Sequence, residues 1–103
     1  MKKAKRIKLE SSGWAVGTAE QFLGLSPEAA AMVEIKLALA DSLRELRRKR
    51  RMTQAEVAER LESSQSRVAK MEAADPTVSL DLLVRSLLVL GKTRREVGEL
   101  LAS

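Results

Sequence analysis

The chain has 103 residues, the length of one small domain, and carries 19 lysines and arginines against 14 aspartates and glutamates, a net charge of +5. It contains no cysteine and no histidine, which excludes disulfides, thiolate metal sites, thiol nucleophiles and the commonest general base. We therefore expect no enzymatic activity, no metal and no cofactor. The basic excess lies in residues 1–52, which hold 12 basic and 6 acidic side chains, against 7 and 8 in residues 53–103.

Membrane insertion and secretion are not expected from the sequence. No apolar run approaches the roughly 20 residues that a membrane-spanning helix needs. The basic start of the chain resembles that of a signal peptide but lacks the apolar segment that should follow. We expect a cytoplasmic protein that does not contact a membrane.

Residues 1–25 combine a basic start with scattered glycines, a pattern that predicts a flexible N-terminal arm. Yet this arm holds the only tryptophan and the only phenylalanine of the chain. Such side chains either order on a partner surface or fold back onto the core, and the sequence supports both alternatives equally. The candidate partner-binding residues of the arm are Trp14, Val16, Phe22 and Leu23.

The folded domain is predicted to occupy residues 26–103 and to open with a long helix. Ser26 can cap the helix, Pro27 suits its first position and Glu28 faces the positive end of its dipole, and the pattern continues to about Arg50. Apolar residues recur at spacings of three and four and predict a buried stripe, formed by Met32, Ile35, Leu39, Leu43 and Leu46. A second stripe is basic and consists of Arg44, Arg47, Arg48 and Arg51.

Two short helices are predicted next, over residues 54–61 and 65–72. Thr53 and Glu56 have the spacing of a capping box, which starts the first of them. Ser63 and Ser64 interrupt the apolar pattern and favour a second helix start after Ser64. A helix fits the major groove of DNA, where residues at its N-terminal end can reach base edges. The candidate base-reading residues on its outer face are Gln65, Ser66, Arg67 and Lys70.

Two further helices complete the predicted all-α fold. Ser79 caps the first, Gly91 ends it, and Thr93 with Glu96 forms a capping box for a short last helix. Several apolar residues of these helices exceed what one buried stripe needs, and we expect them either to form a homodimer interface or to complete the core of the monomer. They are Leu82, Val89, Val97, Leu100 and Leu101.

Residues 43–90 resemble the lambda-repressor/Cro-like (Xre-type) helix-turn-helix family. The resemblance rests on Thr53-Gln54, Val57-Ala58, Leu61, Ser64-Gln65-Ser66, Val68 and Glu72. It implies a compact five-helix domain and binding to double-stranded DNA at a palindromic operator. The sequence departs from the family at three positions that usually hold glycine or another turn former, namely Arg51, Glu62 and Ala74, and a left-handed conformation there costs about 1–2 kcal/mol per residue.

The resemblance also implies roles for individual residues. The arginine at the position of Arg47 commonly pairs with the glutamate at the position of Glu72, which gives Arg47 a structural role. The glutamine at the position of Gln54 contacts a phosphate and braces the one at Gln65. The candidate phosphate-binding residues are therefore Thr53, Gln54, Ser64, Arg48, Lys49, Arg50 and Arg51.

Within this family, the arrangement of an apolar and basic arm, a long first helix and a leucine-rich fourth helix resembles the HigA-type antitoxins. Such proteins repress their own operon and neutralise a RelE-like ribonuclease toxin, so a small toxin protein is an expected partner. Two alternatives remain open. One is a stand-alone repressor of phage type, and the other is a helical adaptor that binds protein without binding DNA.

Overall fold

The computed structural model describes residues 24–102. These form five helices and no strand: α3 (Pro27–Lys49), α4 (Gln54–Arg60), α5 (Gln65–Glu72), α6 (Leu80–Val89) and α7 (Arg94–Ala102). The predicted all-α, five-helix fold is therefore confirmed. Four residues of the arm, Trp14, Val16, Phe22 and Leu23, lie outside the described part, and the predicted division of the chain at residue 26 stays a prediction.

All five helices begin at a residue whose hydroxyl caps the first turn. The hydroxyl oxygens of Ser26, Thr53, Ser64, Ser79 and Thr93 each accept a hydrogen bond, 3.1 Å long, from the backbone N–H three residues later. The carboxylates of Glu56 and Glu96 accept the N–H of their cap residues in return, at 2.7 and 2.9 Å. Each cap pairs backbone N–H groups that the first turn of a helix leaves without a partner. Because the residue types that do this can be recognised in the sequence, each helix start could be located from the sequence.

The first three helices end in a left-handed residue that is not glycine. Arg51, Glu62 and Ala74 have φ angles of 56°, 55° and 54°. Each is followed by a residue whose N–H donates back to the carbonyl five residues earlier, as Ser63 does to Ala58 at 2.8 Å. This is the Schellman arrangement, which favours glycine at its left-handed position. α6 ends in the same way, but at a glycine, Gly91.

We expect Glu62→Gly to stabilise the domain. Removing the Cβ relieves the left-handed residue of about 1–2 kcal/mol of steric strain in the folded state. Glycine also gives the unfolded chain more conformational entropy, which costs about 0.4–1 kcal/mol of stability. The free energy of unfolding should therefore rise by about 0.5–1 kcal/mol. The side chain is exposed, so its removal costs no buried contact. Urea unfolding measures the change. The matched control is Glu59→Gly inside α4, which should lose about 1 kcal/mol, and a loss in both variants would contradict the expectation.

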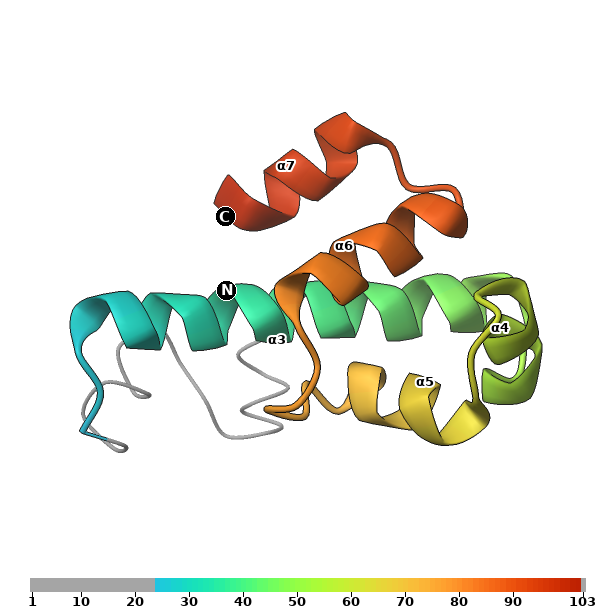
Figure 1. Cartoon of the computed structure of the whole chain (residues 1–103). Helices are drawn as coiled ribbons and strands as arrows, with labels where there is room; N and C mark the ends of the chain where they lie inside the picture. The colour runs from blue at the N-terminus through green and yellow to red at the C-terminus, as the bar shows by residue number, and fades with distance from the viewer. Residues whose placement is uncertain (1–23, 103) are drawn as a thin grey trace.

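The helices are arranged on two sides of the long helix α3 (Figure 1). α5 lies along one side of α3, while α6 and α7 lie along the other, and α4 packs against α5 near the C-terminal end of α3. Between them is a single core whose seven most deeply buried apolar side chains are 0% exposed: Leu39, Leu43, Val57, Val68, Met71, Leu83 and Leu87. α5 is therefore held by its inner face on a rigid support.

Some packing differs from the sequence-based expectation. Met32 was expected in the buried stripe but is 48% exposed, because the first turns of α3 extend beyond the other helices (Figure 1). Conversely, Val78 in the loop before α6 and Leu90 at the end of α6 are buried core residues that no periodic pattern marked. Within residues 24–102, none of the helices has the length and apolar character to cross a bilayer.

Candidate nucleic-acid interface

Two short helices joined by a four-residue turn form the centre of the candidate site. α4 ends at Arg60, α5 begins at Gln65, and the turn between them contains the left-handed residue Glu62. Val57 and Ala58 of α4 are buried, as are Val68 and Met71 of α5. The pair is thus fixed by its inner surface, and its outer surface is available for binding.

A buried ion pair locks this helix pair to α3. The guanidinium of Arg47 donates from Nε and Nη2 to the two carboxylate oxygens of Glu72, at 2.6 and 3.1 Å, and from Nη1 to the carbonyl of Met52 at 3.0 Å. The Gln54 side chain adds a bond to Glu72 at 3.2 Å. Hydrogen bonding to Glu72 is the main cause that raises the pKa of Arg47. The pairing implied by the family resemblance is present, and it joins α3, α4 and α5.

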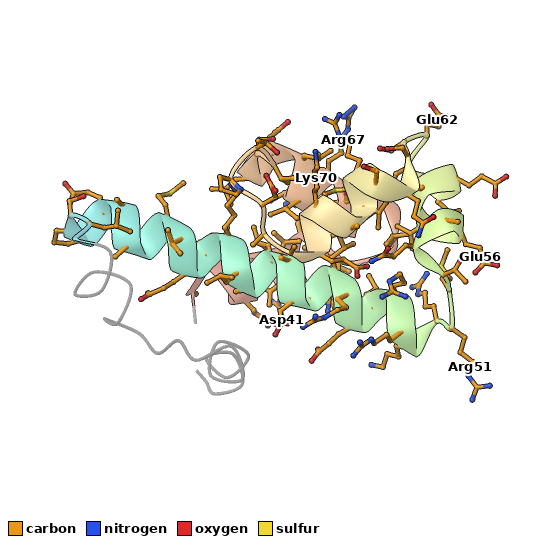
Figure 2. All side chains as sticks on the ribbon, turned by 90° about the horizontal axis from the view of Figure 1, so that it is seen from below. Asp41, Arg51, Glu56, Glu62, Arg67 and Lys70 are labelled. Carbon is orange, nitrogen blue, oxygen red and sulfur yellow. The ribbon has the colours of Figure 1, made fainter. Side chains whose placement is uncertain are left out.

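The outer face of α5 carries the four candidate base-reading residues. Gln65, Ser66, Arg67 and Lys70 are all exposed, whereas Val68, Met71 and Glu72 on the inner side are buried. Figure 2 shows Arg67 and Lys70 on the same side of the molecule. Neither cation has an ion-pair partner among the described residues. The face is therefore polar and positively charged, although Lys70 also interacts with the carboxylate of Asp75.

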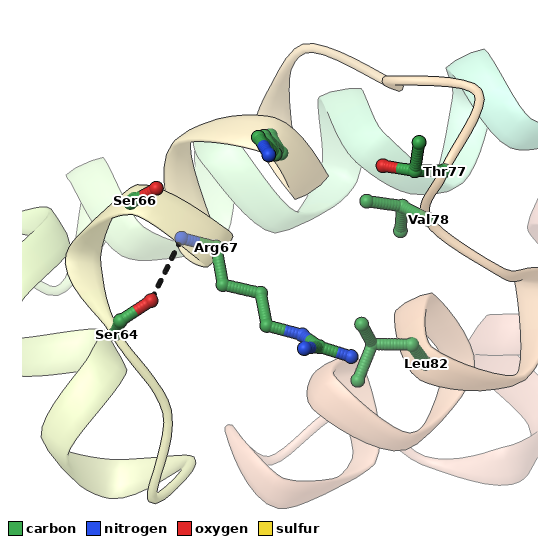
Figure 3. Close-up of a pocket in the computed structure, with 7 residues that line it drawn as sticks. Ser64, Ser66, Arg67, Thr77, Val78 and Leu82 are labelled. Atoms are coloured by element: carbon green, nitrogen blue, oxygen red, sulfur yellow. Dashed lines mark hydrogen bonds between the residues drawn. The ribbon is translucent and has the colours of Figure 1, made fainter.

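A cavity of about 300 Å³ lies beside this face, between α5 and the start of α6. Arg67 and Lys70 line it together with hydroxyls, and Val78 and Leu82 supply apolar surface (Figure 3). Thr77 also lines the cavity and is a site residue that the sequence did not mark. The signal that could have found it is the Asp75-Pro76-Thr77 turn, because an aspartate commonly accepts the N–H two residues later, here at 2.9 Å.

The hydroxyl-bearing phosphate candidates lie at helix starts. Thr53 precedes α4 and Ser64 precedes α5, and their side-chain oxygens already accept backbone N–H groups. The Gln54 side chain donates to Glu72 and is half-buried. These three residues belong to the same α4–α5 unit as Gln65, but the Gln54 amide bonds to Glu72 at the other end of α5, so the implied brace between Gln54 and Gln65 stays a prediction.

The basic candidates at the end of α3 are placed differently. The Arg50 guanidinium lies against Gly91, where an added Cβ would be 2.7 Å from its Nη2 atom. Arg48 and Lys49 line a second depression together with Lys92, a cation that the sequence did not mark as part of this cluster. The α6–α7 connection, which holds Gly91 and Lys92, lies on the opposite side of α3 from α5 (Figure 1). The structure therefore separates these three cations from the outer face of α5.

Arg51 belongs to a further surface, which Arg50 also lines. It follows α3 and borders the outer surface of α4 with Met52 and Glu56. Figure 2 shows Arg51 and Arg67 at opposite edges of the view. Of the four basic candidates, Arg50 and Arg51 therefore lie next to the outer surface of α4, and none of the four lines the cavity beside Arg67.

The candidate dimer residues divide into three groups. Val97 is 6% exposed and belongs to the core of the monomer. Leu82 and Leu100 are partly buried against that core, whereas Val89 and Leu101 are each 46% exposed. For Val97, the alternative expectation of an intramolecular role therefore holds.

A known protein family matches most of the described structure. The family described as a helix-turn-helix domain matches residues 38–100, from the middle of α3 to the last helix. No match was found among curated proteins, and none among solved structures. The matched segment contains α4, the turn, α5 and the ion pair of Arg47 with Glu72. This chain belongs to the helix-turn-helix domain family.

Proposed function

We propose that the protein is a sequence-specific DNA-binding transcriptional regulator that places α5 in the major groove. The observation that carries the proposal is the N-terminal half of α5, where exposed polar and basic side chains stand on a helix whose opposite face is buried. In helix-turn-helix proteins the first residues of the second helix contact base edges. Glutamine can pair bidentately with adenine, and lysine or arginine can pair with guanine.

Selection from a pool of random duplexes tests this proposal. The wild-type chain should enrich a consensus sequence, with two half-sites about one helical turn apart if it binds as a dimer. Lys70→Glu reverses a charge on α5 and should abolish the enrichment. Arg94→Glu makes the same reversal on α7, which lies on the opposite side of α3, and should retain it. Equal losses in both variants would refute the assignment to α5.

Binding as a homodimer to a palindromic operator is part of the same proposal. It is supported by apolar side chains that α6 and α7 leave exposed in the described part of the chain, namely Leu88 at 41%, and Val89 and Leu101 at 46% each. Because each side chain is already more than half buried, completing its burial gains less than half of the roughly 1.5–3 kcal/mol that full burial of an exposed side chain gains. A two-fold pair of chains would bury them twice and would match the two-fold symmetry of a palindrome.

We predict that Val89→Glu and Leu101→Glu each convert a dimer into a monomer. The carboxylate would lie in an apolar interface, where an unpaired charge is costly. Sedimentation equilibrium at micromolar concentration measures the mass, and urea unfolding checks that the monomer stays folded. Asp81→Glu, an exposed change at the start of α6, is the control and should leave the dimer intact. A wild-type monomer at these concentrations would rule the dimer out.

We further propose that the protein is the antitoxin and autorepressor of a toxin–antitoxin operon. This finer role rests on the resemblance to HigA-type antitoxins and on the apolar side chains of the arm. The full chain should then retain a small protein partner at high salt, which suppresses contacts bridged by DNA. Trp14→Asp with Phe22→Asp should release it. If the full chain retains no partner, a stand-alone phage-type repressor is favoured. If it retains a partner but binds no duplex, a protein-binding adaptor is favoured.

A further inference from the structure

The exposed face of α5 has two flanks that point in different directions. Gln65 and Arg67 are two residues apart, so their side chains leave the helix axis in directions about 160° apart. Arg67 and Lys70 are three residues apart and lie next to each other on the helix surface. The base-reading set inferred from the sequence therefore cannot face a single row of base edges, and Gln65 is separated from Arg67.

The cavity beside α5 lies on the flank of Arg67. Arg67, Lys70 and Ser66 line it, and Gln65 does not. Figure 3 shows the Arg67 side chain extending from α5 toward Leu82 of α6. No acidic side chain is among the described residues that line this cavity. An anion that enters it would therefore meet two cations, Arg67 and Lys70, of which Lys70 is also attracted by the nearby Asp75 carboxylate.

The far wall of the cavity is held in place by its own hydrogen bonds. The Thr77 hydroxyl donates to Asp75 Oδ1 at 2.6 Å, and the Thr77 N–H donates to the same oxygen at 2.9 Å. These bonds are the main cause that lowers the pKa of Asp75. From α3, the Lys36 ammonium donates to the carbonyl of Pro76 at 3.3 Å. The loop that faces Arg67 is therefore tied both to itself and to α3.

The geometry favours a phosphodiester as the anion. A duplex seated on α5 places the phosphates of one strand beside the helix, at the edge of the groove. The guanidinium fork matches two phosphate oxygens, and a lysine adds a point charge. Resting on the proposed DNA binding, we propose that Arg67 and Lys70 hold one backbone phosphate in this cavity, and that base reading depends chiefly on Gln65.

Duplexes with single neutral phosphates test the assignment. The selected operator is prepared as a series in which one phosphate at a time is replaced by a methylphosphonate, and binding is measured by fluorescence anisotropy. At one position the wild-type chain should lose about tenfold in affinity, the effect of one hydrogen bond to a charged group. Arg67→Ala should bind the unmodified operator about tenfold more weakly and should lose less than the wild type at that position, because only Lys70 remains to hold the phosphate.

Salt dependence and base preference supply independent readouts. Arg67→Ala should lower the slope of log affinity against log salt by about 0.9 and select the same consensus as wild type. Arg94→Ala, an exposed cation on α7, is the control and should change neither. The phosphate assignment would be overturned if Arg67→Ala selected a different consensus, or if it lost as much affinity as the wild type at every methylphosphonate position. Neither result would contradict the proposed DNA binding. Absence of duplex binding by the wild-type chain would instead overturn the proposed function.

Discussion

Arg47→Ala should lower the free energy of unfolding by about 3–5 kcal/mol, the cost of leaving one member of a buried ion pair without its partner. The Glu72 side chain is 5% exposed, and that of Arg47 is 16% exposed. Without the guanidinium, the carboxylate keeps, among residues 24–102, the Gln54 amide as its one side-chain donor, and the carbonyl of Met52 loses its bond from Nη1. Since small domains are stable by about 5–15 kcal/mol, this single change should bring the chain close to unfolding.

Urea unfolding compares this variant with a matched control on the same helix. Arg44 pairs with Asp41 at 3.0 Å, but the two side chains are 32% and 21% exposed. Arg44→Ala should therefore cost at most about 1 kcal/mol. Replacing both members of the buried pair, as in Arg47→Met with Glu72→Leu, should recover much of the loss because no buried charge remains. Equal destabilisation by Arg47→Ala and Arg44→Ala would show that the pair does not hold the helices together.

Gln65→Ala should weaken binding to the selected operator by about 1–3 kcal/mol and relax the preference at one base pair of each half-site. The side chain is exposed and stands at the first position of α5, so its removal should leave the folded domain intact. A bidentate glutamine contact discriminates between bases, whereas a phosphate contact does not. Gln65→Ala should therefore lose much affinity for the consensus duplex and little affinity for duplexes that are altered at that base pair.

Competition binding with operators mutated one base pair at a time measures this effect. Glu59→Ala, an exposed change on α4, is the control and should keep every base preference of the wild type. An unchanged preference profile in Gln65→Ala would refute its base-reading role. A uniform loss on all duplexes would instead assign Gln65 to the backbone.

The sequence was sufficient for the fold because local signals and packing agree. Each helix start is marked by a serine or threonine cap, whereas the turns at Arg51, Glu62 and Ala74 were expected from the resemblance to a known family, since none of the three is a glycine. Those residues adopt left-handed φ angles because the carbonyls at the helix ends must be paired. The ion pair of Arg47 with Glu72 was expected only because the chain resembles a known family.

The surface on which the long basic side chains at the end of α3 lie could not be predicted from the sequence. Arg48 and Lys49 continue the basic run of α3, yet they line a surface with Lys92, and Arg50 lies against Gly91. Which side of a helix these cations occupy depends on where α6 and α7 cross α3, and this crossing is set by long-range contacts. Val78 was missed for a related reason, since a single buried residue in a loop has no period.

The central claim is that α5 is the surface that meets DNA, and amide chemical shifts of the full chain titrated with the selected duplex test it most directly. The account predicts that the largest shift changes fall on residues 64–70 and on Thr53 and Gln54, with little change along α7. Saturation should occur at one half-site per chain. Largest changes at Arg48, Lys49 and Lys92, with α5 unaffected, would contradict it.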